Sequence, residues 1–285
     1  MRKIKRPEFP LAEIVELCAG SVRDAGLSAR LLAARAHLSA GEADYIGKAT
    51  RGELYAIPVS GAAGDITQAE MSRLYNRTFV RANGPTRHIY DAIKLLAAGA
   101  ICPLCNQRTV STLDHHLSKQ DYPDFAITPV NLVPACRDCN TDTLARESDS
   151  PQKQTFHPYF DYIEDATWLV ASIEKTAPPV IKFAVSPPGA WDDNKRMKIE
   201  HHFETFRLGM LYSAHAAVEL QNIYGELESI DKSGGANAMR EELRQRFSSR
   251  AGVTSNNWQA AMYAALASSA WFCEGGYKSI SPPAL

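Results

Sequence analysis

The chain has 285 residues, a formal net charge of −1 and 45% hydrophobic residues. This composition is typical of a globular protein, and a net charge near zero excludes strong bulk attraction to nucleic acid. No apolar run approaches the roughly 20 residues that span a bilayer, so we expect no membrane partner. The charged start "MRKIKRPEFP" lacks the apolar segment of a secretory signal, and we therefore expect a cytoplasmic protein.

In the first third of the chain, the spacing of apolar residues predicts helices. A sequence rich in Ala and Leu, with apolar residues three and four apart, favours helix from residue 8 to about residue 52. Thr67, followed three residues later by Glu70, predicts the start of another helix. A short amphipathic helix, "RHIYDAIKLLAAGA", then leads to Cys102.

The second half of the chain combines a predicted strand pair with further helices. We expect a helix from Asn140 to about Glu147. The segments "TWLVASIE" and "VIKFAVS" are rich in β-branched and aromatic residues, which predicts two short strands joined by a turn. Helical patterns then return, interrupted by a turn at "SGGAN". The expected fold class is α+β and mostly α, with a small β element in the cysteine region.

Four of the six cysteines form two Cys-x-x-Cys pairs, Cys102 with Cys105 and Cys136 with Cys139. In a reducing compartment, such short-spaced pairs are typical of metal ligands rather than of disulfides. Four thiolates suit the tetrahedral coordination of Zn²⁺, and a closed four-cysteine site is structural. We therefore predict a zinc ion that stabilises the fold without taking part in chemistry.

Between and after these pairs lie "TVSTLDHHL" and "NLVPACRDCN", which place Asp-His after a β-branched run and Asn after the last cysteine. This order resembles the HNH endonucleases, the zinc-stapled branch of the ββα-metal (His-Me finger) nucleases. The resemblance covers about residues 100 to 147. The sequence also resembles a bacterial subfamily of HNH proteins with α-helical flanks. This resemblance implies three regions: an N-terminal helical region (1–84), a ββα-metal nuclease module (85–150) and an α-rich C-terminal region that includes the predicted strand pair (151–285).

Hydrolysis of a phosphodiester bond needs a base that deprotonates water and a cation beside the scissile phosphate. Histidine is suited to be the base, since its pKa lies close to neutrality. Carboxylate and amide oxygens are hard ligands suited to Mg²⁺ or Mn²⁺. The resemblance implies that His115 is the general base and that Asp114 and Asn140 hold the catalytic ion. It also implies that Asn131 fixes the loop between the strands and helps to orient the histidine.

The adjacent histidines leave two registers open. In the colicin nucleases of this superfamily, the first of two adjacent histidines is a metal ligand and the second is the base, which would assign these roles to His115 and His116. In the other register Asp114 is the ligand and His115 is the base. We favour this second register because a carboxylate is the better ligand for Mg²⁺. Similar family members carry Asp-His, a variable residue and Leu-x-Lys; here the segment is "DHHLSK", with Ser118 where a proline is common.

The predicted finger is itself acidic. Between Ile101 and Glu147 there are four basic and six acidic residues, so nucleic acid would be held mainly from outside the finger. Arg73, Arg77 and Arg81 recur every four residues and would share one helix face if the helix extends that far. They are either a phosphate-binding surface or an ordinary solvated basic face. No base-reading motif is recognisable, so we expect weak sequence specificity.

The function that the resemblance implies is metal-dependent hydrolysis of double-stranded DNA, with RNA as another candidate substrate. HNH proteins with helical flanks also resemble effectors of bacterial anti-phage defence that work beside an ATPase. No G-x-x-x-x-G-K-[ST] motif occurs in this chain, so any NTP-driven step would belong to such a partner. The alternative, from a different class, is a zinc-stabilised module that binds nucleic acid or protein without cleavage.

Overall fold

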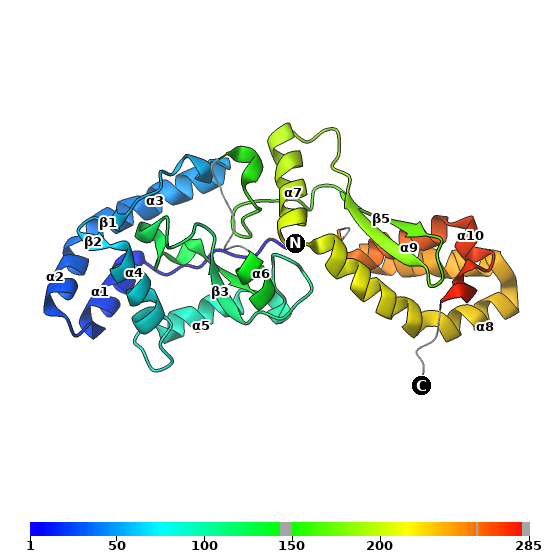
Figure 1. The fold of residues 1–285 in the computed structure, drawn as a ribbon, viewed down its shortest axis with the longest axis horizontal. Helices are drawn as coiled ribbons and strands as arrows, with labels where there is room; N and C mark the ends of the chain where they lie inside the picture. Colours follow the sequence, from blue (N-terminus) through cyan, green and yellow to red (C-terminus); the bar gives the residue numbers. More distant parts are fainter. Residues whose placement is uncertain (143–149, 255, 281–285) are drawn as a thin grey trace. The chain divides into compact units, whose positions relative to one another are not determined.

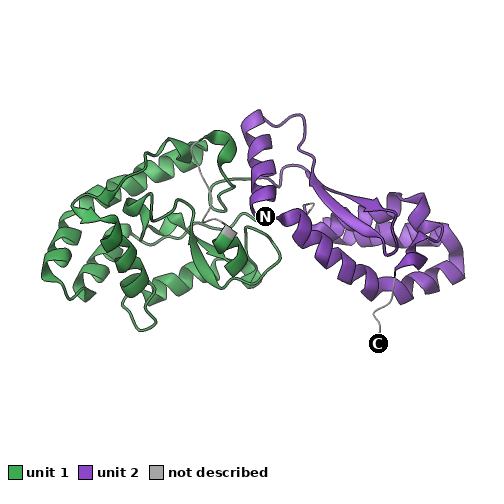
Figure 2. Cartoon of the chain, viewed as in Figure 1, with its two compact units in different colours: residues 1–162 green, residues 163–285 purple. Residues whose placement is uncertain are grey.

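The computed structural model describes residues 1–142, 150–254 and 256–280. The chain divides into two compact units, residues 1–162 and residues 163–285 (Figure 2). Among the described residues helices predominate, and the strands form two-stranded antiparallel sheets (Figure 1). The prediction of a mostly α protein with small β elements is therefore confirmed. Across the described ranges, no helix combines the length and the apolar character needed to span a membrane.

Unit 1 opens with three helices, which confirm the predicted helical N-terminal segment: α1 (Leu11–Ser21), α2 (Ala25–Ala33) and α3 (Arg35–Arg51). Asp24 caps α2, because its carboxylate accepts backbone N–H groups at 2.9 and 3.1 Å. Gly52 ends α3 with a φ of 72°, a left-handed conformation that glycine adopts without strain. Two very short strands, β1 (Ala62–Ala63) and β2 (Ile66–Thr67), follow.

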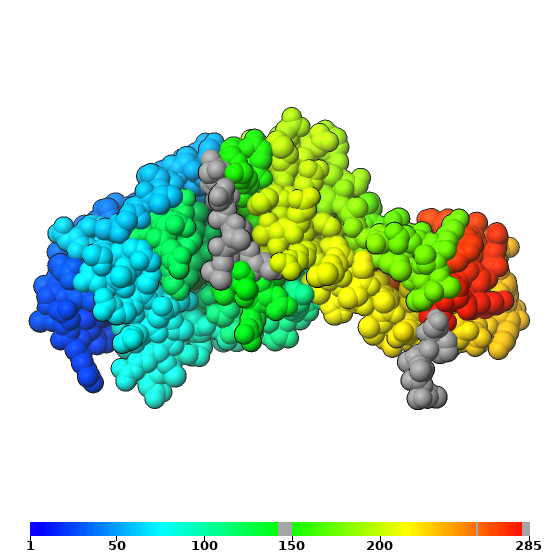
Figure 3. Space-filling model, viewed as in Figure 1, coloured from blue at the N-terminus to red at the C-terminus, as the bar shows by residue number. Residues whose placement is uncertain are grey.

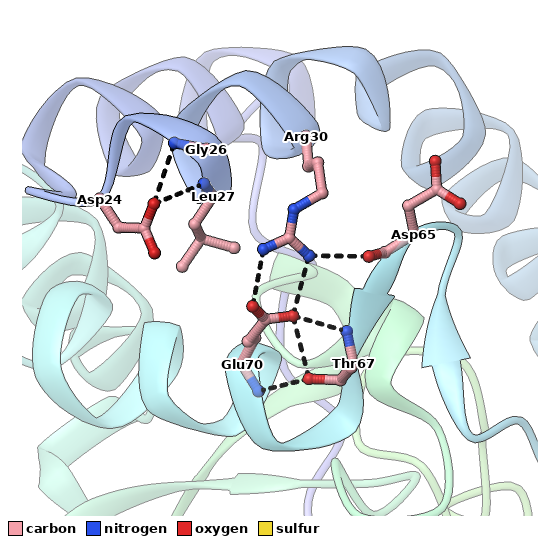
Figure 4. A network of polar contacts seen from close by, with 7 residues as sticks. All are labelled: Asp24, Gly26, Leu27, Arg30, Asp65, Thr67 and Glu70. Carbon is pink, nitrogen blue, oxygen red and sulfur yellow. Dashed lines mark hydrogen bonds and ion pairs between the residues drawn. The ribbon is translucent and has the colours of Figure 1, made fainter.

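A polar network connects α2 with the start of α4 (Gln68–Leu74), as Figure 4 shows. The Thr67 hydroxyl accepts the N–H of Glu70 at 3.3 Å, and the Glu70 carboxylate accepts the N–H of Thr67 at 2.9 Å, which confirms the predicted helix start. Arg30 on α2 forms a bidentate ion pair with Glu70 at 2.7 and 3.0 Å. This ion pair is the main influence that lowers the pKa of Glu70 to about 2.

Helix α4 continues directly into a π-helical turn, Tyr75–Phe79, before α5 (Arg87–Leu95) begins. The wider π turn leaves Tyr75 and Phe79 buried, with their rings stacked at a centroid separation of 5.6 Å. Such turns occur frequently at functional sites. Because the helix ends at Phe79, Arg81 lies outside it, and the three arginines of the sequence pattern do not share one continuous helix.

The cysteine region contains β3 (Thr112–His115), β4 (Leu132–Ala135) and α6 (Arg137–Asp142). The two strands are antiparallel, with Asp114 opposite Val133 and His115 opposite Leu132. Helix α6 packs against β3, and α5 packs against both strands. The strands therefore pack against the helix that precedes them in the chain, α5, and the helix that follows them, α6. The expected continuation of α6 to about Glu147 lies outside the described residues.

One hydrophobic core joins the N-terminal helices to this β element. Its members include Ile14, Leu31, Phe79, Ile93, Leu113 and Leu132. A second cluster packs Tyr45 of α3 against Phe125 and Val130, in the long connection between β3 and β4. The predicted regions 1–84 and 85–150 thus share their apolar packing, and α3 supports the loop that lies between the two strands.

Unit 2 begins with the strand pair that the sequence predicts, β5 (Leu169–Glu174) and β6 (Val180–Val185), which pair in an antiparallel register. The helices that follow are α7 (Asp193–Thr205), α8 (Leu208–Ala251), α9 (Trp258–Ser268) and α10 (Ala270–Cys273). Gly235, with φ 61° and ψ −157°, interrupts α8 within "SGGAN", at the predicted turn. Both α8 and α9 pack against the strand pair.

Candidate active site

The four paired cysteines converge on one point of unit 1. Cys102, Cys105, Cys136 and Cys139 are all buried, and their sulfur atoms lie within 4.8 Å of one another. A tetrahedral zinc ion with Zn–S bonds of about 2.3 Å requires sulfur atoms roughly 4 Å apart. The four thiols are therefore arranged to hold a metal ion such as zinc. The pairs come from the loop after α5 and from the junction of β4 with α6.

Backbone hydrogen bonds shape each half of this cysteine cluster. The Cys102 N–H donates to the Arg108 carbonyl at 2.8 Å, and the Arg108 N–H donates to the Cys105 sulfur at 3.4 Å. The Cys139 N–H donates to the Cys136 sulfur at 3.4 Å. Donors aimed at sulfur favour the thiolate form that binds a metal. A hydrogen bond with Cys102 is the main cause that lowers the pKa of Cys136 to about 7.

Asp114 and Asn140 lie on neighbouring elements beside this cluster. Asp114 is in β3 with only 5% of its surface exposed, and Asn140 is in α6, which packs against β3. The Asn140 N–H donates to the Cys136 carbonyl at 3.1 Å, so the first turn of α6 connects Asn140 to the cysteine cluster. Asp114 thus carries a buried carboxylate and Asn140 a helix amide, on two elements that pack together.

His115, the last residue of β3, has a defined tautomer. Its Nε2 atom lies 2.9 Å from the Ala126 carbonyl oxygen, and because a carbonyl can only accept, Nε2 carries the proton. The ring also contacts Tyr75 edge-on, at a centroid separation of 4.4 Å. Burial, with the charge of Lys119 as a second cause, lowers the pKa of His115 to about 3, well below the near-neutral value expected from the sequence. The neutral imidazole therefore keeps Nδ1 as a proton acceptor.

Asn131 is fully buried in the turn directly before β4 and holds the long connection between the strands. Its Oδ1 atom accepts the N–H of Leu117 at 2.7 Å, and its Nδ2 atom donates to the carbonyls of Leu117 and Phe125 at 2.9 and 3.1 Å. The Phe125 end of this connection leads directly to Ala126, which binds His115. Asn131 thus fixes the backbone that supplies the hydrogen-bond acceptor of His115.

His116 lies in different surroundings from its neighbour. Its N–H donates to the Asn131 carbonyl at 2.9 Å, and its ring packs against His157 at a centroid separation of 4.2 Å. His157 is buried and lies 3.0 Å from the Tyr45 hydroxyl, which in turn donates to Asn131 at 3.1 Å. The Tyr159 N–H donates to Nδ1 of His157, so Nε2 is the protonated nitrogen that faces Tyr45.

Three neighbours of the site could not be found from the local sequence pattern. Tyr75 lies forty positions before His115 in the chain, and Tyr45 lies still earlier. Lys119 belongs to the segment "DHHLSK" that carries the family resemblance, but the sequence gives no indication of what it contacts. Its ammonium lies 4.6 Å from the centre of the Tyr75 ring. The ring of Tyr75 therefore touches both His115 and Lys119.

Comparison with known proteins gives one distant relative. The chain is 28% identical over 232 residues to "Protein ea31" of Escherichia phage lambda, a match that covers 76% of this chain and 78% of the phage protein. No family model matches the chain, and no solved structure matches it. The relative's name describes no activity, so functional conclusions depend on the geometry of the site.

Proposed function

We propose that this protein is a metal-dependent HNH endonuclease that hydrolyses phosphodiester bonds of DNA. The observation that carries the proposal is the state of His115: Nε2 is held by the Ala126 carbonyl, and the neutral ring keeps Nδ1 as an acceptor beside a buried aspartate. A strand pair followed by a helix, next to four convergent cysteines, supports the resemblance to the zinc-stapled ββα-metal nucleases.

In the proposed reaction, Nδ1 of His115 accepts a proton from a water molecule as the water oxygen attacks the phosphorus atom. The bond between phosphorus and one ester oxygen breaks, and that oxygen leaves with the bonding electron pair. A divalent ion held by Asp114 and Asn140 would supply the positive charge that stabilises the phosphate and the leaving oxygen. Asn131 is a positioning residue, because it acts through the backbone that holds His115.

Between the two registers, the geometry favours His115 as the base and Asp114 as the ligand. A base needs one ring nitrogen fixed by a hydrogen bond and the other free to accept, and His115 meets this requirement. The His116 ring instead packs against His157, in the network that includes Tyr45 and Asn131. We assign His116 a supporting role in that network.

The test is cleavage of supercoiled plasmid DNA with Mg²⁺ or Mn²⁺, by the wild type, His115→Ala and His116→Ala. The wild type should cut, and His115→Ala should be slower by about 100-fold or more, since general bases contribute about that much. Equal cleavage by the wild type and His115→Ala would overturn the assignment of the base. If no divalent ion supports cleavage of DNA or RNA while binding remains, the alternative of a zinc-stabilised binding module is correct. The ATPase partner and the defence role remain expectations from the resemblance.

A further inference from the structure

Lys119 lies beside the candidate active site, where the charge of Asp114 acts on it without a close ion pair in the described part of the chain. Its Nζ atom is 3.3 Å from the Asn76 amide oxygen and 4.6 Å from the centre of the Tyr75 ring, and both partners are neutral. No carboxylate forms an ion pair with Lys119 among the described residues. The half-buried ammonium therefore keeps a positive charge that an anion can approach.

Lys119 and His115 both contact the same tyrosine ring, which places the lysine near the proposed catalytic groups. The Tyr75 ring that lies under the ammonium also packs against the His115 imidazole. The charge of Lys119 acts on His115, and the charge of Asp114 acts on Lys119. Lys119 is thus close to both the proposed base and the proposed metal ligand, where a scissile phosphate would bind.

Two exposed arginines extend this positive charge along the neighbouring helix. Arg77 is in the π-helical turn next to Asn76, and Arg73 is in the last turn of α4. Within the described ranges, neither guanidinium has an ion pair or hydrogen bond. The segment that contains them, in cyan, reaches the surface of unit 1 in Figure 3.

Two other basic side chains of this region, Arg87 and Lys94, do have partners, unlike Arg73 and Arg77 within the described residues. Arg87 forms an ion pair with Asp91 at 2.8 Å. Lys94 donates to the Ser111 carbonyl at 3.2 Å and lies 5.8 Å from the centre of the Tyr90 ring. Lys94 therefore resembles Lys119 in its contacts, one oxygen and one tyrosine ring, but its contacts do not include His115.

We propose that Lys119 binds a backbone phosphate of the nucleic-acid substrate next to His115, and that Arg77 and Arg73 bind the phosphates that follow on the same strand. An ammonium is a compact point charge suited to one phosphate, and guanidinium groups pair with phosphate oxygens through two parallel hydrogen bonds. The inference rests on the proposed nuclease function and deepens it by placing the substrate backbone along α4. Tyr75 and Asn76 position the Lys119 ammonium.

A binding experiment tests Lys119 apart from catalysis. His115→Ala protein, which should bind without cutting, is titrated into fluorescent duplex DNA between about 50 and 200 mM salt. The plot of log K against log salt has a negative slope, and each phosphate contact that is lost makes this slope less steep by about 0.9. Lys119→Met should show this loss and weaker binding, Lys119→Arg should keep the slope, and Lys94→Met, the matched control, should be unchanged.

Steady-state cleavage kinetics then distinguish the role of Lys119 from the roles of Arg73 and Arg77. Lys119→Met should lower kcat as well as raise KM, because its phosphate is the one near the reacting atoms. The double variant Arg73→Gln/Arg77→Gln should raise KM by several-fold with little change in kcat. Arg23→Gln, an exposed arginine of the same unit between α1 and α2, serves as its control.

The outcomes distinguish the two proposals. If the wild type binds and cuts DNA but Lys119→Met matches Lys94→Met in slope and rate, the phosphate-binding role of Lys119 is wrong and the nuclease proposal remains. If the wild type neither binds nor cuts nucleic acid, both proposals are wrong. A Lys119→Arg variant as impaired as Lys119→Met, with an unchanged melting temperature, would also contradict a role based on positive charge.

Discussion

The Nε2 atom of His115 donates a hydrogen bond of 2.9 Å to the backbone carbonyl of Ala126, eleven residues later in the chain. This contact selects one tautomer and directs the opposite nitrogen, Nδ1, away from the connection that contains Ala126. The acceptor is a backbone atom, so its position depends on the loop and not on the identity of the Ala126 side chain. The buried amide of Asn131 holds that loop through Phe125.

The first prediction concerns the two adjacent histidines. His115→Asn and His116→Asn should differ, because His115 has a fixed Nε2 and an accepting Nδ1, whereas the His116 ring packs against His157. His115→Asn should lower kcat by about 100-fold or more with its zinc content unchanged. His116→Asn should retain most of kcat and lose stability, since its ring packs against His157. The same loss of kcat in both variants would contradict this division of roles.

The second prediction concerns the metal. The native protein should contain one zinc ion per chain, measured by elemental analysis, because the four thiols converge within 4.8 Å. Cys136→Ser should lose the ion and lower the free energy of unfolding by several kcal/mol, since structural zinc contributes directly to folding. Cys18→Ala removes a buried thiol from α1, outside the cluster, and should retain the zinc. Full zinc occupancy in Cys136→Ser would contradict the four-cysteine site.

The third prediction concerns the Tyr45 hydroxyl, which links Asn131 to His157. Tyr45→Phe should lower the free energy of unfolding by about 1–3 kcal/mol, because it removes the buried hydroxyl that bonds both Asn131 and His157. Tyr90→Phe is the matched control: this tyrosine is also buried, but its hydroxyl has only a long 3.5 Å contact with Thr112. Chemical denaturation of both variants provides the comparison, and equal losses would show that the network contributes no stability.

The fourth prediction concerns pH. The pKa of Glu70 in the folded protein is about 2, below its ordinary value, because Arg30 stabilises the charged carboxylate. A lowered pKa means that this contribution to stability is complete above about pH 4.5 and disappears as the pH falls toward 2. Glu70→Gln should therefore cost roughly 1 kcal/mol at pH 7, the upper end of the range for an ion pair at the surface, and much less near pH 3.

Denaturation of the wild type and Glu70→Gln at these two pH values measures the difference. Glu8→Gln, which removes an exposed carboxylate from the N-terminal segment, should behave as the wild type at both. A cost of Glu70→Gln that does not change with pH would mean that the charge of Glu70 does not provide the stability.

Several features follow from the sequence alone because the physical cause is local. The spacing within each Cys-x-x-Cys pair allows both thiols of a pair to reach one ion, and the structure brings the two pairs together. Thr67 and Glu70 form the predicted helix start, because a capping box involves only residues three positions apart. The β-branched and aromatic residues predicted the β5–β6 pair, and the glycines of "SGGAN" predicted the turn that interrupts α8.

Other features depend on contacts between residues far apart in the chain, which no local spacing encodes. The sequence left two registers open for His115 and His116 and favoured His115 as the base only through the ligand chemistry of the preceding aspartate. The packing of Ala126, Tyr75 and His157 around the two rings gives them different surroundings. The regular spacing of the arginines suggested that they share one helix face. The structure contains a π-helical turn that ends at Phe79, so Arg81 lies outside the helix. Burial and pairing are properties of the folded chain, so only the tertiary structure decided which basic side chains form ion pairs and which do not.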